Sequence, residues 1–531
     1  MASQASAQWA QQQVLTNSLV GAFESKPFDY EGDGDIDFLT ANINSGNLFV
    51  QRNNGNGTYT QITLPGVSGL TTCGNIHLVD PDGDGDLDIL VGASGQPQFF
   101  PPGIVNSELF LLRNNGGGSW QKTFSNTDPG FPGGWDLDTA DMNGDGNLDI
   151  VLSLGLVYDQ VGWRAGTGFA GGGAFGSGPG GVNTVVNGQG NANGQNNEPR
   201  DIELADVDGD GDTDVLVCFY LSNELVWFSN NGNGAFFTRN LIEGSAMGAR
   251  QVRAGDLNGD GIVDVVRTTV LNGQIAYFLG QGNGSFGSKV IVSTVPTSPT
   301  GGGLSGTDER GPRGMSLADF DDDGDLDIVV ASETNGEVIV HYNNGAASFT
   351  NPATVVSTTA GSVVHVFPVD ADGDGDTDIV STATATGKVR LHLNTCNGSC
   401  GTVTTFGSSC DASPGVAPNL TSNAPKLGQS WNLVVGNIGQ APAAFVLFGS
   451  QPANPVLSLA IFGAQGCNAY TIPDLGWFVA ANAGGAAPYP LTVPNNSSII
   501  GTQLTCQGSV ASTLNNFGIA TTNALSVRVG N

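Results

Sequence analysis

An acidic loop of nine residues, with the pattern D-x-[DEN]-G-D-G-x-x-D or close to it, recurs seven times between Asp29 and Asp378. Alternate side chains of a tight loop can converge on one point, and glycine at position 6, as at Gly85, permits the sharp turn. Such an oxygen-only ligand set suits Ca²⁺, whereas Mg²⁺ prefers a smaller octahedron and keeps its waters. The loops contain no His or Cys, which disfavours zinc and copper. The sequence therefore predicts about seven calcium sites.

The expected calcium ligands occupy positions 1, 3, 5 and 9 of the seven loops. They are Asp29, Glu31, Asp33 and Asp37; Asp80, Asp82, Asp84 and Asp88; Asp141, Asn143, Asp145 and Asp149; Asp206, Asp208, Asp210 and Asp214; Asp256, Asn258, Asp260 and Asp264; Asp319, Asp321, Asp323 and Asp327; and Asp370, Asp372, Asp374 and Asp378. Asn143 and Asn258 keep an oxygen but lack a charge, so the third and fifth sites should bind more weakly. Asp322 stands at position 4 of the sixth loop, where the other loops have glycine, so the geometry of that turn does not follow from the others.

Two other interpretations of the loop can be weighed. An EF-hand shares its opening but needs a glutamate at position 12 and flanking helices. Position 12 is never acidic here, and β-type runs such as Ile89-Leu90-Val91 follow position 9. The loop is therefore expected to join two strands. Solvated acidic turns without a metal are the other alternative, and seven copies in register argue against it.

The charge of the chain is concentrated in these loops. The formal net charge is −32, yet outside the loops the acids are as many as the 17 Lys and Arg. Basic residues do not cluster, so a nucleic-acid partner is not expected. There is no apolar run of 18 residues, so no membrane span is expected. Ala5-Ser6-Ala7 resembles the end of a signal-peptide cleavage site, with an ordinary flexible N-terminus as the alternative.

The loops start at intervals of 50 to 65 residues, a period typical of propeller blades or solenoids. Most intervals predict four strands, with an Asn/Gly turn such as NNGNGTY (Asn53 to Tyr59) before the fourth. Four antiparallel strands form one propeller blade. Gln8 to Leu15 is expected to complete the seventh blade and close the ring. The predicted fold class is all-β: a seven-bladed β-propeller closed by an N-terminal strand, followed by a small β-sandwich domain.

The loop, the strand after it and the Gly-x-Phe turn together resemble the FG-GAP/VCBS repeat family, whose blades also occur in integrin α-subunits. The resemblance covers about residues 8–395 and implies calcium ligands at positions 1, 3, 5 and 9 of each loop. The third blade departs from the pattern. It lacks the Asn/Gly turn and contains a Gly-rich stretch from Gly166 to Gly194, so its outer strands do not follow from the repeat.

The first strand of each blade is expected to line a central channel, because polar and apolar residues alternate along it. The polar side chains are Lys26, His77, Asp138, Glu203, Arg253 and Ser316, and Glu24, Asn75, Asp136, Asp201, Gln251 and His365. Such a channel could hold a sugar or an active site, although a hydrated channel is the commoner case.

Three long insertions, 96–106, 155–199 and 292–312, are predicted on the face opposite the acidic loops. Long loops on a rigid scaffold often carry binding sites, and tolerated surface loops are the alternative. No catalytic or cofactor-binding residue is predicted. None of the four histidines lies in a nucleophile or metal motif, and the loop carboxylates are assigned to metal.

The cysteines are unevenly distributed. Cys73 and Cys218 lie in blade strands and are expected to be buried thiols. The other five are Cys396, Cys400, Cys410, Cys467 and Cys506. Cys396–Cys400 and Cys467–Cys506 are candidate disulfides, although the connectivity does not follow from the sequence. This clustering favours an oxidising, extracellular compartment.

Three segments follow from these patterns: a propeller over 8–395, a Cys-containing linker over 396–410 and a β-sandwich over 411–531. The last segment has short predicted strands at 431–435, 444–449, 457–462, 489–493, 504–507 and 524–529. Its stretches AQGCNAY, LTVPNNSSIIGTQLTCQG and TNALSVRVG resemble the C-terminal domain of secreted proteins from planctomycete-type bacteria. That resemblance implies surface attachment, sorting or assembly.

Together these features predict a secreted, calcium-binding propeller that acts as a non-enzymatic binding, adhesion or structural protein at the cell surface. Its partner would be an extracellular protein or glycan, or another copy of the chain. One alternative is a carbohydrate-binding lectin or polysaccharide-active enzyme, with Trp163, Phe99 and Phe100 as sugar platforms. Another is a self-assembling extracellular fibre or coat subunit.

Overall fold

The chain divides into two compact units: residues 1–320, 324–372 and 377–394 form the first, and 321–323, 373–376 and 395–531 form the second. The computed structural model describes residues 9, 11–16, 18–64, 73–81, 84–93, 108–116, 118–126, 135–154, 160–166, 183–186, 197–234, 238–297, 311–321, 323–350, 352–358, 362–372 and 376–394, and the ten strands of the second unit that are given below. The described residues form strands, turns and bends, without a helix.

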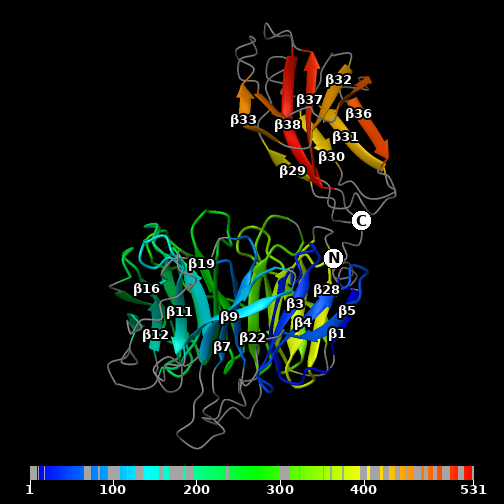
Figure 1. Cartoon of the computed structure of the whole chain (residues 1–531). Helices are drawn as coiled ribbons and strands as arrows, with labels where there is room; N and C mark the ends of the chain where they lie inside the picture. Colours follow the sequence, from blue (N-terminus) through cyan, green and yellow to red (C-terminus); the bar gives the residue numbers. More distant parts are fainter. Residues whose placement is uncertain are drawn as a thin grey trace, which may run out of the picture. The chain divides into compact units, whose positions relative to one another are not determined.

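The first unit consists of seven four-stranded antiparallel sheets, which are the blades of a propeller (Figure 1). Blade 1 comprises β2 (Ala22–Phe28), β3 (Asp37–Asn42), β4 (Leu48–Asn53) and β5 (Tyr59–Thr63); blade 2 comprises β6 (Asn75–Val79), β7 (Asp88–Ala93), β8 (Glu108–Asn114) and β9 (Trp120–Asn126). Blade 3 comprises β10 (Asp136–Ala140), β11 (Asp149–Leu154), β12 (Gln160–Arg164) and β13 (Asn183–Val186); blade 4 comprises β14 (Pro199–Ala205), β15 (Asp214–Phe219), β16 (Glu224–Ser229) and β17 (Thr238–Glu243). Blade 5 comprises β18 (Ala249–Gly255), β19 (Asp264–Thr269), β20 (Gln274–Phe278) and β21 (Val290–Thr294); blade 6 comprises β22 (Pro312–Ala318), β23 (Asp327–Ser332), β24 (Glu337–His341) and β25 (Thr354–Thr358). Blade 7 comprises β26 (Val363–Val369), β27 (Asp378–Ala383), β28 (Lys388–Leu393) and β1 (Gln11–Thr16).

The ring is closed both along its innermost strands and at its outer rim. The innermost strands contact one another in the order β2, β6, β10, β14, β18, β22, β26 and back to β2. At the rim, β1 pairs antiparallel with β28, as the sequence predicts. The indole Nε1 of Trp9 donates a hydrogen bond to the hydroxyl of Tyr342 in blade 6, at 2.9 Å. Closure places the inner strand of every blade at the channel and leaves one short outermost strand at the rim of each blade, so only short edges stay open.

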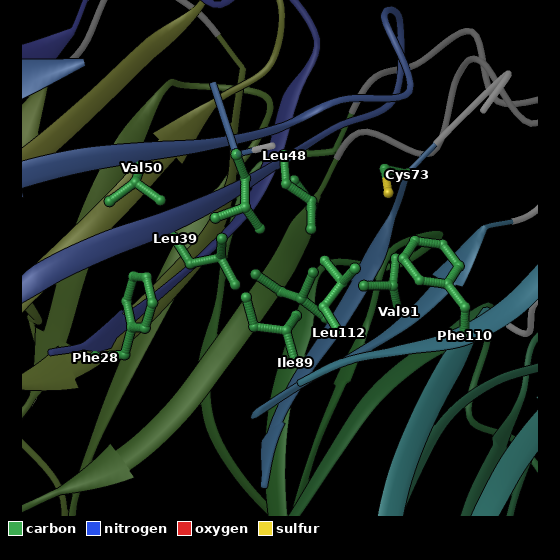
Figure 2. Close-up of a cluster of buried hydrophobic side chains, with 12 residues drawn as sticks. Phe28, Leu39, Leu48, Val50, Cys73, Ile89, Val91, Phe110 and Leu112 are labelled. Carbon is green, nitrogen blue, oxygen red and sulfur yellow. The ribbon is translucent and has the colours of Figure 1, made fainter. Parts of the chain in front are cut away.

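The core lies between the blades. Each of the seven interfaces between neighbouring blades holds its own cluster of buried apolar side chains. Figure 2 shows the cluster between blades 1 and 2, where Leu39 and Val50 lie opposite Ile89, Val91 and Leu112. The second strand of a blade is covered on both faces, which is why runs such as Asp264–Thr269 are buried at every position.

The second unit contains three sheets. β29 (Val403–Phe406), β38 (Ile519–Arg528), β37 (Gln503–Ala511), β32 (Ala443–Gly449) and β35 (Gly476–Ala481) form one in that order; β30 (Asn419–Ser422), β31 (Ser430–Gly436) and β36 (Ala487–Thr492) form another; β33 (Pro452–Ser458) and β34 (Asn468–Thr471) form the third. Most strands expected here are present; β33 at Pro452–Ser458 overlaps the start of the strand expected over 457–462, and residues 459–462 lie outside the described part of the chain. Its prolines suit a strand in a two-stranded sheet, where fewer N–H groups must pair. The sandwich arrangement of these sheets stays a prediction.

One expectation for the first unit is confirmed and one open question about it is answered, whereas several expectations for the cysteines of the second unit cannot be compared. Cys73 and Cys218 are buried thiols, and blade 3 has the two outer strands that the pattern left open. Cys396, Cys400, Cys410 and Cys467, and the side chain of Cys506, lie outside the described residues. The candidate disulfides therefore stay predictions. Among the described residues there is no helix with the length and hydropathy that a membrane span requires.

Candidate metal centres and the central channel

The aspartate at position 9 organises each acidic loop. It opens the second strand of every blade and is at most 1% exposed in all seven. Its Oδ1 accepts a hydrogen bond of 2.6–2.7 Å from a backbone N–H at or just beyond the end of the third strand. The pairs are Asp37–Asn53, Asp88–Asn114, Asp149–Gly166, Asp214–Asn230, Asp264–Gly280, Asp327–Asn343 and Asp378–Asn394. This contact joins the acidic loop to the following turn on the same face of the blade, as the sequence predicts.

The other oxygen of the same aspartate bonds within its own loop. In six loops Oδ2 accepts the backbone N–H of position 2, at 2.7–3.0 Å. The second loop has Pro81 at position 2, which carries no N–H. Position 9 is thus a structural acceptor in its own right as well as an expected metal ligand, a role that the sequence pattern alone did not reveal.

The aspartate at position 1 holds the turn itself. Asp206 Oδ1 accepts the N–H groups of Gly209 (2.8 Å) and Asp210 (3.1 Å), and its Oδ2 accepts that of Gly211 (3.0 Å). Asp29, Asp141 and Asp256 make the same set of bonds. Gly209 and Gly211 have φ values of +79° and +93°, a backbone conformation that side chains other than glycine rarely adopt.

Three loops bring carboxylates together closely enough to share a cation. Each group offers one oxygen per residue, and these oxygens lie within 4.8 Å of one another. The groups are Asp206, Asp208 and Asp210; Asp319, Asp321 and Asp327; and Asp370, Asp372 and Asp378. Asp82, Asp322 and Asp374 lie outside the described residues. Among the described residues of the other four loops, no such group of three acids forms.

Two of those four loops carry the asparagine expected to weaken binding. Asn143 Nδ2 donates to Asp149 Oδ2 at 3.2 Å, and Asn258 Nδ2 donates to Asp260 Oδ2 at 3.0 Å. The amide therefore bonds to an expected co-ligand and screens its charge. In the first loop, Glu31 lies 3.5 Å from the guanidinium of Arg52.

The donor set fits a hard divalent cation. Burial raises the pKa of Asp37 and of Asp149 to about 6 and that of Asp214 to about 7. A cation within reach of such a buried carboxylate favours its charged form and offsets the cost of burial. If calcium binds, the residues that would hold it are the carboxylates at positions 1, 3, 5 and 9, and its contribution would be structural.

Asparagine side chains connect neighbouring acidic loops. Asn343 Nδ2 donates to Leu257 O in blade 5 (2.7 Å) and to Leu326 O in its own loop (3.1 Å). Asn230 and Asn394 make the equivalent pair of bonds, to Met142 and Thr213 and to Phe320 and Thr377. In the sequence this asparagine is visible as a turn residue, since Asn230 and Asn343 are each the first residue of an NNG turn.

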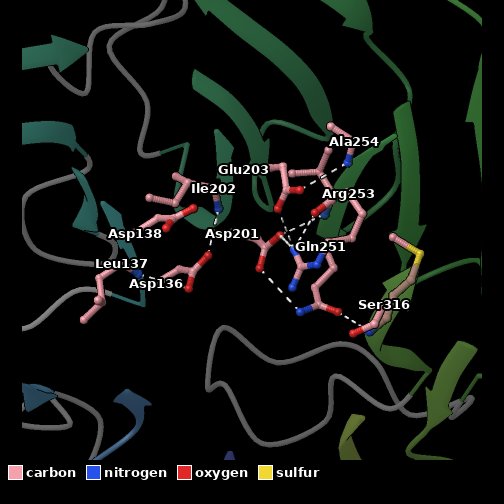
Figure 3. A network of polar contacts seen from close by, with 12 residues as sticks. Asp136, Leu137, Asp138, Asp201, Ile202, Glu203, Gln251, Arg253, Ala254 and Ser316 are labelled. Atoms are coloured by element: carbon pink, nitrogen blue, oxygen red, sulfur yellow. Dashed lines mark hydrogen bonds and ion pairs between the residues drawn. The ribbon is translucent and has the colours of Figure 1, made fainter. Parts of the chain in front are cut away.

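The innermost strands surround a cavity of about 210 Å³. All twelve polar side chains that the sequence assigned to the channel line it. Figure 3 shows part of this lining, with Asp136, Asp201, Gln251 and Arg253 in one network of polar contacts. The expected alternation of channel-facing and packed residues is therefore confirmed.

Side-chain acceptors link four of the seven pairs of neighbouring innermost strands around the channel. Asp136 Oδ2 accepts the N–H of Ile202 at 3.0 Å, and Asp201 Oδ2 accepts that of Val252 at 2.9 Å. Glu24 and Gln251 do the same for Ile76 and Met315. Each acceptor lies five residues before the first aspartate of its loop and bonds to the next blade. The inner edge of a blade has no further strand to pair with, so these side chains satisfy its N–H groups.

The ionisable side chains of the channel either form ion pairs or have pKa values shifted by burial toward the neutral form. Arg253 Nη1 lies 3.0 Å from Asp201 and 3.5 Å from Glu203. Burial raises the pKa of Glu203 to about 7, and it raises that of Asp136 with help from nearby Asp201. Burial lowers the pKa of His77 to about 3 and that of His365 to about 4, so both imidazoles are neutral at pH 7.

The described residues do not form a catalytic arrangement. Ser381 and His392 lie 2.8 Å apart, as do Ser293 and His341, but both histidines are completely buried. A buried pair of this kind cannot meet a substrate and is a packing contact.

Trp163, expected as a sugar platform, belongs to the core. It is 4% exposed, and its Nε1 donates to Gly234 O in blade 4 at 3.1 Å. That expectation is wrong because the indole fills the interface between blades 3 and 4. Phe99, Phe100 and the whole 96–106 insertion lie outside the described residues, as do most of 155–199 and 298–310.

The repeat and the fold can be compared with those of known proteins. A model of the FG-GAP-like repeat matches residues 29–91, 176–267 and 319–381, which contain every acidic loop except the third. No curated protein matches the chain. A solved structure of an Agrocybe aegerita lectin that recognises non-reducing terminal N-acetylglucosamine is 24% identical, with a TM-score of 0.44, over 64% of this chain and 81% of that one. BBS1N, solved in complex with ARL6DN, is 12% identical, with a TM-score of 0.45, over 73% of this chain and 97% of that one. The first unit of this chain is a seven-bladed β-propeller built from FG-GAP-like repeats.

Proposed function

We propose that this chain is a secreted binding protein whose propeller is stabilised by calcium in the acidic loops and whose ligand contacts the central channel. FG-GAP-like propellers suit a binding or structural role, because a rigid ring presents fixed side chains at its centre. The observation that carries the calcium part is the convergence of carboxylate oxygens within 4.8 Å in three loops of one repeated sequence.

Calcium would act on stability rather than on chemistry. The loops also bond internally through positions 1 and 9, so these hydrogen bonds would support the turns together with the ion. Like charges in each loop still repel, and a cation removes that repulsion. A ligand that binds only the folded state stabilises it by RT ln(1 + [L]/Kd), about 2.7 kcal/mol per site at a hundredfold excess over Kd.

The test compares thermal unfolding of the full chain in 1 mM free Ca²⁺ and in excess EGTA. We expect the melting temperature to fall by about 10 °C or more on chelation, because several sites are emptied together. Magnesium at the same concentration serves as the control and should restore little of the loss. A melt that does not change in EGTA would show that the loops hold no structural calcium.

Secretion is proposed from the same features together with the C-terminal cysteines. Acidic loops of moderate calcium affinity fill where free calcium is at millimolar level, as it is outside cells. Expression of the chain with an export signal, followed by thiol counting on the folded product, tests this. We expect fewer than five reactive thiols among the C-terminal cysteines, and five would contradict an oxidising compartment.

A further inference from the structure

Five of the seven innermost strands carry a β-bulge at the same place, next to the channel. The pairing with the second strand skips one residue in β2, β14, β18, β22 and β26. The skipped residues are Phe23, Arg200, Arg250, Arg313 and Val364, and all of them line the cavity. A bulge leaves its residue out of the ladder and re-aims the side chain. In these five blades the chain thus turns an extra side chain toward the channel, six residues before the acidic loop.

The residue six positions before the acidic loop, which we call the bulge level, differs in type from blade to blade. Blades 1 and 7 place Phe23 and Val364 there, and blade 3 places Trp135 at the same distance before its loop. Blades 4, 5 and 6 place Arg200, Arg250 and Arg313 there. Because other blades accept an apolar residue, the fold itself does not require arginine at this position. Three adjacent blades nevertheless carry a charged side chain there, and Arg200 and Arg250 are buried, which requires compensating contacts.

Two of these arginines are held in place by their surroundings. The guanidinium of Arg200 lies 4.1 Å from the ring centre of Trp135, and its Nη2 lies 2.6 Å from Glu198. Arg313 Nη1 lies 2.8 Å from Glu333, and its guanidinium lies 5.3 Å from the ring centre of Phe23. A guanidinium carries its five N–H donors in a planar fork, a geometry that matches a carboxylate. Such support fixes an arginine for a planar anionic partner.

Below the arginines the same cavity is lined by carboxyl groups. Asp136 and Asp201 lie one residue further along their strands than the bulge level, and Asp138 and Glu203 lie two residues beyond these. Burial keeps the pKa of Asp138, like those of Asp136 and Glu203, above the ordinary range. Carboxyl groups of this kind accept hydroxyl hydrogens and, when protonated, also donate. The cavity therefore offers N–H donors at one level and partners for hydroxyl groups at the next.

We propose that the channel binds an acidic sugar residue, with its carboxylate on the arginines of blades 4–6 and its hydroxyl groups on the carboxyl groups below. This inference rests on the proposed binding function and names its ligand class. An inorganic anion would use only the arginine level, and a neutral sugar only the carboxyl level. A ligand with both groups, such as a uronate, uses both.

The test is calorimetric titration of the calcium-loaded full chain with trigalacturonate and with its methyl ester. The ester has the same shape without the negative charge, so it is the matched control ligand. We expect the acid to bind at least tenfold more tightly than the ester. The idea fails if neither binds, if both bind equally, or if glutamate or inorganic phosphate binds as tightly as the acid.

Variants locate the site. Arg250→Gln and Arg313→Gln should each weaken trigalacturonate binding at least tenfold. Arg239→Gln is the matched control, because Arg239 is also salt-bridged, at 2.8 Å from Glu224, but does not line the cavity. Arg250→Lys keeps the charge and loses the planar fork, so it should weaken binding several-fold even if the Gln variant does not fold. Unchanged binding in the folded Arg250 and Arg313 variants would overturn the assignment.

The calcium melt separates this proposal from the function on which it rests. If the chain has a lower melting temperature in EGTA but does not bind trigalacturonate, the calcium sites are supported and the sugar proposal is wrong. If the chain binds trigalacturonate but has the same melting temperature with and without calcium, the sugar proposal is supported and the structural calcium sites are wrong.

Discussion

At one end of each innermost strand lies an acidic loop, and at the other end lies the channel level with its bulges. The loop end is nearly the same in all seven blades: position 9 is always aspartate, always buried, and always bonded to the following turn. The channel end carries phenylalanine, tryptophan, arginine or valine in six blades, and blade 2 has Gly74 at that position.

The seven blades place seven different sequences on the same type of sheet, so they can be compared position by position. Where every blade uses the same residue, blade geometry or metal binding requires it. Where the blades differ although the backbone is alike, the fold leaves the choice open and another requirement can decide it. We therefore place stabilisation at the loop end and ligand recognition at the channel end.

The largest expected effect separates two roles within one loop. Asp214→Ala removes the acceptor of two buried N–H groups, those of Val207 and Asn230, so it should cost about 3 kcal/mol of unfolding free energy even in EGTA. Asp208→Ala, at position 3, should change the EGTA value by less than about 1 kcal/mol and lower stability only when calcium is present. Chemical denaturation with and without calcium measures both. Equal losses for the two variants in EGTA would contradict the structural role of position 9.

The next effect concerns the link between loops. Asn343→Ala removes two hydrogen bonds to buried carbonyl groups and should cost about 2 kcal/mol. Its neighbour Asn344 is exposed, so Asn344→Ala is the matched control and should cost less than about 0.5 kcal/mol. Denaturant melts in calcium compare the two. A loss at Asn343 no greater than that at Asn344 would show that the contact between blades 5 and 6 is not stabilising.

A smaller effect tests the channel end by pH. The pKa of Glu203 is raised to about 7 from an ordinary 4.5, so the folded state retains a proton that the unfolded state releases between these values. The stability from this group is therefore present below pH 4.5 and is lost as pH rises toward 7. Glu203→Gln mimics the protonated form and should be about 1 kcal/mol more stable than the parent at pH 8.

The control for that variant is the same comparison at pH 4.5, in calcium. There the two proteins should have nearly equal unfolding free energies, because the parent also carries the proton. A stability difference that is the same at both pH values would mean that Glu203 ionises normally in the folded protein.

The smallest expected effect returns to the loops. Asn143→Asp restores a carboxylate at position 3 of the third loop and removes the amide bond to Asp149. We expect calcium affinity at that site to rise several-fold, because one more charge faces the ion. Equilibrium dialysis at limiting free calcium should detect more bound ion than in the parent. Asp208→Asn, the reverse change in the fourth loop, should lower the affinity by a similar factor. A lower affinity in Asn143→Asp or a higher affinity in Asp208→Asn would contradict the charge argument.

Much of the propeller was predictable because the repeat encodes local rules. A turn that needs glycine, an oxygen at alternate positions and a β-branched run after Asp88 can each be recognised without knowing what lies nearby. The polar alternation along the innermost strands predicted the channel for the same reason. Trp163 was misassigned because the sequence around an aromatic residue next to a loop is the same whether its side chain faces solvent or packs against the next blade.

The sequence by itself determined the number of blades, the strand that closes the ring and the oxygen-rich loops, since these depend on spacing along the chain. Only the tertiary structure decided which atoms meet. The bond from Asn230 to Asp214, the bond from Asn343 to Leu257 of blade 5 and the cavity shared by Arg200, Arg250 and Arg313 all bring together residues of different strands or blades. Such contacts are set by the closure of the ring, which brings distant segments to a common radius and which no local pattern specifies.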